Sequence, residues 1–546
     1  MTPPVAPRPT IGTRSRTLSD LETAVILLHY PGFHRLAKTL PYAKDDPAVH
    51  GHRNRDHPKA IVLLLGVMTR VCHGLPGAEA VFRSPDAWNV VRKHWCHLKQ
   101  VGVIGAEEPD ELPLRPVKAA QWRYMVQRFK DCDDGIDRLV QVFTEDAVAL
   151  ALDLGYFSQG SLSNPHITSC LFADGTELRS QYRCYVDLIP CGESGEKVPM
   201  AVEPGRNGKI RALLVQDEEG RWRGVDPGTG ELLKKLPVDP EALASGKYGP
   251  TQSAYNLVPL SVRGPDERSR VTVGVDIDLQ DSAEAQTILR VVKRVIAQGG
   301  LEGIVQAIIT DKILRGTHQL ELLTQHGVVT ITKVAAAPGS ESPRAQQVVD
   351  AGGKRCKTLP LGQFTHLRPD GRECPHLLHV IDGKVVEVDF NADATELLVI
   401  GDVPRRQVKR RKETLARGTE YRFDVRHSVE CKHGPFDVWI CPQKRLGDDG
   451  RKMAENYRIF PEGDPVFVAL YGLARNTSEG GNAHTKATYP HKRSQSTGRV
   501  ATLLDIHLYF FLDNVKTWYF QGGFRTVDPV LHPSPVELRG LAALAS

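Results

Sequence analysis

The stretch "LYGLARNTSEGGNAHTKATYP", residues 470–490, places polar side chains at helical spacing along an otherwise mixed segment. Steps of four, four, three and four residues separate Tyr471, Arg475, Glu479, Asn482 and Lys486. Such steps return to the same side of an α-helix, so these side chains share one face. A phenol, a guanidinium, a carboxylate, an amide and an amine together suit the binding of phosphate and metal. The stretch therefore predicts a helix that presents ligands on one face.

A simpler interpretation of the same stripe stays open. The polar face of an amphipathic helix is usually just solvated, and a pair such as Arg475 and Glu479 is a common surface ion pair. Gly480 and Gly481 also cost a helix about 1 kcal/mol each relative to alanine. The stripe alone therefore does not indicate a function; it does so only together with acidic residues elsewhere in the chain.

Two aspartates follow predicted strands. "HITSCLFADGTEL", residues 166–178, predicts a strand that ends at Asp174, and "GIVQAIITDK", residues 303–312, one that ends at Asp311. Ligands of α/β sheets gather at the carboxyl ends of strands. Carboxylates brought together there suit a hard cation such as Mg²⁺ or Mn²⁺. Asp187, Asp276 and Asp278 also lie near predicted strand ends and remain alternatives for the first two acids.

The elements between the two aspartates follow a recognisable order. Residues 253–264 and 269–278 predict a hairpin, and residues 281–300 predict an amphipathic helix with an N-cap at Asp281 or Ser282 and a stop at Gly299. A helix at 316–327 and a strand at 328–334 follow Asp311. A Gly- and Pro-rich insert at about 188–250 separates the first two strands.

The rest of the chain divides by composition. The ranges are a disordered start at 1–18, a helical N-terminal domain at 19–150, a core at 166–335, a β-rich insertion at 336–450, a last core part at 451–525 and a flexible tail at 526–546. Within the helical domain, Gly74 or Gly77 fits the turn of a helix-turn-helix DNA reader, but a plain helical bundle is the favoured interpretation.

This order of elements resembles the RNase H-like fold of the DDE transposases of bacterial insertion sequences. The opening stretch is similar to the Y-R-E-K signature of the members that carry a β insertion before the catalytic glutamate. Three residues separate Arg475 from Glu479 and six separate Glu479 from Lys486, as in that signature, whereas Tyr471 stands one residue farther from Arg475. "FADGTELRS" (172–180) and "TDKILRGTHQLELLTQHG" (310–327) also resemble the blocks around the first two catalytic aspartates.

The resemblance implies an α/β fold with an RNase H-like catalytic core, a mixed sheet with flanking helices. It implies that Asp174, Asp311 and Glu479 hold two Mg²⁺ or Mn²⁺ ions for DNA cleavage and strand transfer. Arg475 and Lys486 would then bind phosphate. Tyr471 would pack against the DNA backbone, and Asn482 would orient Glu479 or touch DNA. The implied partners are double-stranded transposon ends and target DNA, bound by a homodimer. A domesticated or inactive DNA-binding relative is the alternative.

Two Cys-x-His pairs lie in the predicted β insertion. "ECPHLLH" (373–379) and "ECKHG" (430–434) supply Cys374, His376, Cys431 and His433. Together they make a Cys₂His₂ set that suits tetrahedral zinc, and residues two apart on a strand face the same side. Three further residues could replace a member of the set: Cys356, Cys441 and His379. Buried thiols and surface histidines without a metal remain the alternative.

Basic residues concentrate in two runs. "RRQVKRRKE" (405–413) is the denser, and its candidates for contacts with DNA phosphates are Arg405, Arg406, Lys409, Arg410 and Arg411. "HKRSQSTGR" (491–499) follows the polar helix. Such runs are more often solvated surface, so DNA contact is one of two interpretations.

Composition is that of a soluble globular protein. The 546 residues are 41% hydrophobic and 25% charged, with a net charge of +5 that permits nucleic-acid binding without requiring it. The longest apolar run, residues 60–68, is far shorter than the roughly 20 residues of a membrane span, and no secretory signal is visible. We therefore expect a cytoplasmic protein with no membrane segment, whose ten cysteines are reduced or bind metal. The resemblance to the transposases of insertion sequences further implies a bacterial protein associated with the nucleoid.

Overall fold

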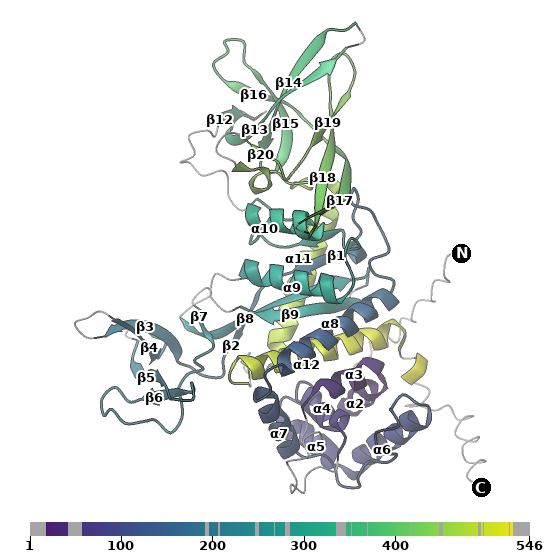
Figure 1. Ribbon diagram of the computed structural model, residues 1–546, viewed down its shortest axis with the longest axis vertical. Coiled ribbons are helices and arrows are strands. Elements are labelled where there is room, and N and C mark those ends of the chain that lie inside the picture. The colour runs from purple at the N-terminus through teal and green to yellow at the C-terminus, as the bar shows by residue number, and fades with distance from the viewer. Residues whose placement is uncertain are drawn as a thin grey trace.

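The computed structural model is a mixed α/β protein in which several sheets and many helices follow one another along an elongated molecule (Figure 1). The residues that the structure describes are 18–41, 57–191, 196–205, 208–245, 251–266, 268–278, 284–334, 346–350, 352–368, 370–416, 418–446, 451–489, 493–494, 496–523 and 525–527. The predicted disordered start, except residue 18, and nearly all of the predicted tail lie outside these ranges.

A mixed sheet occupies the middle of the molecule. Its strands are β1 (Cys170–Ala173), β2 (Thr176–Arg179), β7 (Leu243–Ser245), β8 (Gln252–Arg263), β9 (Arg270–Ile277), β10 (Ala307–Ile309) and β11 (Val329–Ile331). The order across the sheet is β9, β8, β1, β10 and β11, with β2 and β7 also paired to β8. Strand β8 is antiparallel to both of its neighbours, β9 and β1, whereas β10 and β11 run parallel to β1. The predicted hairpin and the predicted strands before Asp174 and Asp311 are confirmed.

Helices flank this sheet. They are α8 (Gly135–Asp153), α9 (Glu284–Gln298), α10 (Gly316–Glu321) with the π-turn Leu322–His326, α11 (Pro465–Thr488) and α12 (Arg499–Trp518). The apolar side of α9 packs with α8 and the inner strands in one core. The predicted helix at 316–327 ends as expected at Gly327, which has a left-handed backbone with φ of 65°. The N-cap expected at Asp281 or Ser282 lies outside the described residues.

Helices also fill the N-terminal segment, as predicted. They are α2 (Asp20–His29), α3 (Pro31–Thr39), α4 (Lys59–Met68), α5 (Leu75–Arg83), α6 (Pro85–Gln100) and α7 (Ala119–Lys130), followed by α8. A capping box formed by Ser19 and Glu22 begins α2. The apolar faces of these helices meet α12, which is buried along most of its length, in a single hydrophobic core. The N-terminal helices therefore pack around a helix that lies more than 350 residues later in the chain.

Three β-rich units project from this body. The insert forms a four-stranded antiparallel sheet of β3 (Tyr185–Cys191), β4 (Glu196–Val202), β5 (Ile210–Gln216) and β6 (Trp222–Val225). A ring follows, formed by β12 (Gln346–Val349), β13 (Arg355–Leu367), β14 (Glu373–Ile381), β15 (Lys384–Phe390) and β16 (Leu397–Asp402). The ring closes because β12 pairs with both β13 and β16. The third unit contains β17 (Arg405–Leu415), β18 (Gly418–Val429) and β19 (Phe436–Ile440).

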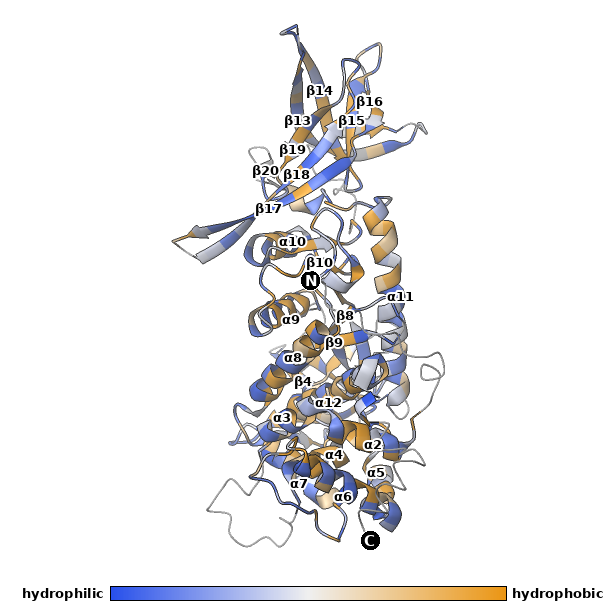
Figure 2. Cartoon of the chain, turned by 90° about the vertical axis from the view of Figure 1, so that its right-hand side faces the viewer, coloured by the Kyte–Doolittle hydropathy of each residue, from blue (hydrophilic) through white to orange (hydrophobic). Residues whose placement is uncertain are grey.

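Hydropathy follows this architecture. Hydrophobic residues predominate in the upper half of α11, and β17 is strongly hydrophilic (Figure 2). Among the described helices, none combines the length and the apolar content needed to cross a lipid bilayer.

Candidate functional site

Helix α11 carries the polar stripe, and its two halves have different surroundings. The Asp464 carboxylate caps the helix by accepting a hydrogen bond from the Val466 N–H at 2.8 Å, and Pro465 occupies the first helical position. Apolar residues of the first half, among them Phe467 and Leu470, enter the core that lies beneath β1 and β10. The helix contacts both strands, and its Tyr471 and Arg475 side chains contact Asp311, just beyond the end of β10.

A small pocket lies where α11 crosses the strand ends. It is lined by Phe172, Ala173, Asp174, Ile309, Thr310, Asp311, Tyr471, Ala474, Arg475 and Ser478. Both strand-end aspartates and two members of the helical stripe thus face one space. The chain brings together segments separated by more than 300 residues to build it.

Arg475 joins two of the predicted acids. Its Nη1 lies 3.4 Å from Asp311 Oδ2, and its Nε lies 3.0 Å from Glu479 Oε1. The Tyr471 hydroxyl donates to Asp311 Oδ1 at 3.4 Å. Partial burial raises the pKa of Asp311, but the Lys312 backbone N–H and the Arg475 guanidinium outweigh it and hold that pKa below its usual value. Asp311 is thus an ionised carboxylate at neutral pH.

Asp174 has the opposite electrostatic environment. Burial, and next the negative charge of Glu284, raise its pKa to about 6, against a partial opposing effect of Arg475. The charges of Asp311 and Glu479 raise it further. Asn482 donates its Nδ2 to Asp174 Oδ2 at 3.1 Å. The pocket therefore holds more negative charge than the neighbouring cationic side chains neutralise.

Glu284 belongs to this group, although the sequence analysis did not single it out. It begins α9, and its Oε1 accepts the Gly175 N–H at 3.0 Å. A Cβ at position 175 would lie 2.3 Å from that oxygen, so only glycine allows this approach. Glu284 also raises the pKa of Asp278, whose buried carboxyl accepts from Asn256, although burial is the main cause. An acidic residue in the first turn of a helix normally indicates dipole stabilisation, which is why it gave no signal.

The three predicted acids lie in one region, but their carboxylate oxygens do not all lie close to one another. Both Asp311 and Glu479 affect the Asp174 carboxyl electrostatically, and both contact Arg475. Even so, among the described residues these three carboxylates do not form a set whose oxygens all lie within 4.8 Å of one another. The guanidinium of Arg475 lies between two of them. Lys486 lies on the same helix, seven residues beyond Glu479.

The alternative aspartates have other surroundings. Asp187 lies on β3 in the separate insert sheet. Asp276 is buried and pairs with Arg290 at 3.0 Å and with Arg294 at 3.4 Å. Burial raises the pKa of Asp276, but these guanidinium groups more than offset it and lower that pKa. Asp276 is thus a structural ion-pair partner. Asp278, whose pKa is raised mainly by burial, lies close enough to Glu284 for that negative charge to raise this pKa further.

Some side chains of the basic run on β17 are buried against the protein, and others are exposed to solvent. Arg405 is nearly buried and pairs with Asp464 at 3.1 Å. Arg410 donates to the carbonyls of Gly327 at 2.7 Å and Gly303 at 2.6 Å. Of the predicted DNA contacts in this run, Arg406, Lys409 and Arg411 are exposed, and Lys412 of the same run is exposed as well. Of these, Arg411 pairs with Asp424, and the Lys409 ammonium lies 4.6 Å from the centre of the Trp439 ring.

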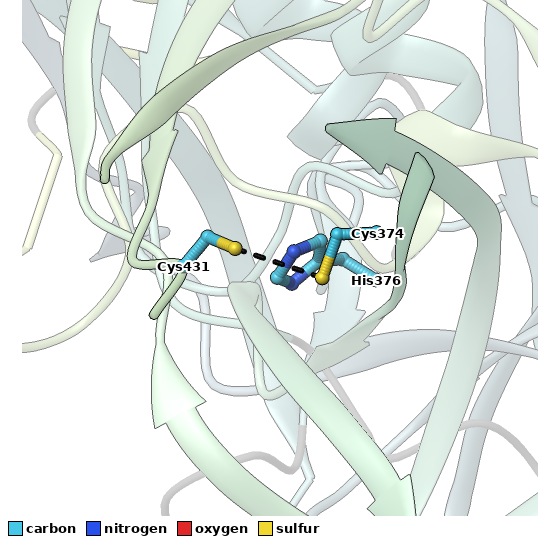
Figure 3. A group of neighbouring side chains, drawn as sticks. All are labelled: Cys374, His376 and Cys431. Carbon is cyan, nitrogen blue, oxygen red and sulfur yellow. Dashed lines mark hydrogen bonds between the residues drawn. The ribbon is translucent and has the colours of Figure 1, made fainter. Parts of the chain in front are cut away.

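The Cys/His pairs give a three-membered set in place of the predicted four. Ligand atoms of Cys374, His376 and Cys431 all lie within 4.8 Å of one another (Figure 3). His433 is exposed in the turn after Cys431 and is not part of this set, so the structure brings three of the four predicted ligands together. The three proposed substitutes also lie outside the set. Cys356 contacts Asp350, Cys441 contacts Gln443, and His379 contacts Thr358.

Comparison with known proteins adds no family to this description. No protein-family model matches the chain, and no curated protein matches it.

Proposed function

We propose that this protein is a DDE-type transposase that cleaves and joins DNA at the ends of an insertion sequence. One observation carries the proposal: the strand-end pair, Asp174 and Asp311, shares a pocket with Arg475 of α11. Arg475 pairs with Asp311 and also with Glu479, which lies one turn farther along the same helix. Any one of these features is common in unrelated proteins. Their convergence from distant segments, in the chain order of the DDE signature, is the support.

The order of elements supports an RNase H-like core. Three antiparallel strands precede a helix, a parallel strand leads to the second aspartate, and a late helix bears the third acid. The β-rich ring and the sheet of β17–β19 lie between that strand and that helix, in the place of the β insertion in the Y-R-E-K group. We propose the mixed sheet as the catalytic core and these β units as the insertion.

The donor set fits divalent cations. Carboxylate oxygens suit Mg²⁺ and Mn²⁺, and the raised pKa of Asp174, caused by burial and then by Glu284, reports negative charge that a cation would neutralise. Asp174, Asp311 and Glu479 would hold such ions. Bound there, Mg²⁺ or Mn²⁺ would activate a water or a 3′-hydroxyl and stabilise the leaving oxygen of a phosphodiester.

The remaining residues of the stripe would bind and orient the DNA strand. Arg475 has an exposed side chain, and exposed ion pairs contribute about 1 kcal/mol or less. It can therefore leave Asp311 and Glu479 at little cost and turn to a phosphate, which a guanidinium binds as a fork. Asn482 would hold the Asp174 carboxylate in place. Lys486 would add a point charge near the cleaved end. A homodimer on double-stranded DNA, associated with the bacterial nucleoid, belongs to the same proposal.

A DNA-binding relative that no longer cuts is the second candidate. It is favoured by Arg475, which occupies the space between two of the acids in this structure. The two candidates differ in one measurable property, which is metal-dependent cleavage.

Cleavage and strand transfer on DNA that carries the sequences flanking the gene separate these candidates. Glu479→Gln should abolish Mg²⁺- or Mn²⁺-dependent cleavage while the protein still binds the same DNA. Glu396→Gln is a matched control, because Glu396 is also an exposed glutamate paired with an arginine, Arg355, at 2.6 Å, but on the ring. Cleavage by the Glu479→Gln protein at the wild-type rate would refute the assignment. Binding without cleavage by the wild-type protein would favour the second candidate.

A further inference from the structure

We propose that Cys374, His376 and Cys431 bind one Zn²⁺ ion that fastens the β ring to the neighbouring sheet of β17–β19. This site lies in the β-rich part of the chain and does not depend on the proposed cleavage activity. It would be a structural metal site, chemically distinct from the carboxylate pocket under α11.

The sulfur positions suit a shared tetrahedral metal. Cys374 Sγ and Cys431 Sγ lie 3.6 Å apart. Two thiolates about 2.3 Å from zinc, at a tetrahedral angle, stand about 3.8 Å apart, whereas sulfurs joined in a disulfide are only about 2.05 Å apart. The two thiols are therefore already near the separation that zinc requires.

The surroundings of His376 suit a third metal ligand. The residue is buried, and its Nδ1 interacts with the Glu387 carboxylate, while its Nε2 is buried and has no hydrogen-bond partner among the described residues. A carboxylate on one imidazole nitrogen fixes the tautomer and leaves the other nitrogen free as a metal ligand. The ring lies beside the line that joins the two sulfur atoms (Figure 3). A buried, unpaired nitrogen costs free energy, and a metal ion would satisfy it.

The three ligands come from two separate β units. Cys374 and His376 are two residues apart on β14 and so face the same side of the ring. Cys431 follows β18 and begins a turn in which the Gly434 N–H donates to its carbonyl at 2.9 Å. Phe436, the first residue of β19, covers the site, with its ring centre 4.9 Å from that of His376. Zinc would thus link β14 to the β18–β19 turn.

The chemistry of the set selects zinc over the cations expected at the carboxylate pocket. Thiolate and imidazole ligands favour Zn²⁺, whereas Mg²⁺ and Mn²⁺ prefer oxygen. Both thiols lose their protons on binding, so two thiolates neutralise the charge of the ion. Both cysteines are half-buried, which gives water access to the fourth position, and His433 lies outside the set. We therefore infer three protein ligands and one water.

Metal content of the full-length protein, purified under reducing conditions, tests this proposal. Mass spectrometry of the metals should find about one zinc per chain in the wild type. Cys374→Ser, Cys431→Ser and His376→Ala should each lower that content at least tenfold. Cys356→Ser and Cys441→Ser are matched controls, because they remove half-buried cysteines of the same β-rich region that lie outside the set, and they should keep the zinc.

Two further measurements separate loss of metal from loss of fold. Co²⁺ added to the metal-free protein should give thiolate-to-metal charge-transfer absorption in the wild type and not in Cys374→Ser, while both keep the same far-ultraviolet circular dichroism. His433→Ala should keep the full zinc content, and its loss there would overturn the three-ligand form. Wild-type protein that lacks zinc and takes up neither Zn²⁺ nor Co²⁺, or that contains a Cys374–Cys431 disulfide under these conditions, would overturn the site itself.

Discussion

Replacing Asp174 by asparagine should stabilise the protein at neutral and higher pH. Burial, Glu284 and the other carboxylates raise the pKa of Asp174 from its usual 3.8 to about 6. Asp174→Asn removes the charge that this environment disfavours, while the side-chain oxygen can still accept the hydrogen bond from Asn482. The substitution therefore isolates the electrostatic cost of the carboxylate.

The magnitude follows from the two pKa values. The difference between 3.8 and about 6 corresponds to about 3 kcal/mol at most, at about 1.36 kcal/mol per pKa unit. Because the side chain is only partly buried, solvent screening lowers this figure, and we expect a gain of about 1–2 kcal/mol. A cooperative unit of 150–250 residues then gains about 2–4 °C in melting temperature per kcal/mol.

Because the pKa of Asp174 is raised in the folded protein, the stabilisation by Asp174→Asn depends on pH in a definite direction. A carboxyl with a raised pKa in the folded state binds protons that the unfolded chain releases, so its cost to stability grows as pH rises from about 4 to about 6 and is constant above. The advantage of Asp174→Asn should thus be full at pH 8 and about half as large at pH 5. Asp276→Asn is the opposite control, because Arg294 and Arg290, outweighing burial, lower the pKa of Asp276. That substitution should destabilise the protein at pH 8.

The same experiment also measures how much divalent cations stabilise the wild type and Asp174→Asn. Mg²⁺ or Mn²⁺ at ten times its dissociation constant should stabilise the wild type by about 1.4 kcal/mol, and should stabilise Asp174→Asn much less. Thermal unfolding monitored by fluorescence, with and without the ions at both pH values, measures all of these effects. The reasoning is refuted if Asp174→Asn is no more stable than the wild type at pH 8, because the carboxylate then carries no uncompensated charge.

Four other substitutions test the packing of α11, of β17 and of the helical core. Gly480→Ala should stabilise α11 by up to about 1 kcal/mol, since a Cβ there meets open space, whereas Gly481→Ala should cost about 1–3 kcal/mol in thermal unfolding, since its Cβ would lie 1.6 Å from Arg270 Nη1. Arg410→Ala should cost about 1–3 kcal/mol and speed hydrogen exchange in the two loops whose carbonyls it binds. Phe511→Ala should cost about 3–5 kcal/mol in chemical denaturation, because the ring is fully buried in the helical core.

Local patterns were sufficient to predict much of the central body. The strands before Asp174 and Asp311 are short apolar runs that end at polar residues, and α11 has a capping aspartate and helical spacing. The polar stripe was predictable for the same reason, because its members share one helix. Tyr471, Arg475 and Asn482 each contact one of the two strand-end aspartates in the structure.

Features that depend on distant partners were not predictable. The closure of the ring depends on pairing between β12 and β16, which no local pattern encodes. Glu284 lies beside Asp174 because Gly175, in another segment, permits its close approach. His433 matches Cys431 in spacing, as His376 matches Cys374, but a turn leaves it exposed whereas a strand buries His376. Residue spacing alone cannot distinguish these two outcomes.

Arg405 shows how the β insertion and the polar helix depend on each other. As part of a dense basic run it was predicted to contact DNA, yet its guanidinium lies over the Phe460 ring, 4.3 Å from the centre, and pairs with Asp464. Asp464 is the N-cap of α11, so a strand of the insertion holds the start of the helix that carries Glu479. With both side chains nearly buried, breaking this pair would leave a costly unpaired charge. We therefore infer that Arg405 positions α11 over the strand ends, and that the β units between β11 and α11 help to set the geometry of the pocket.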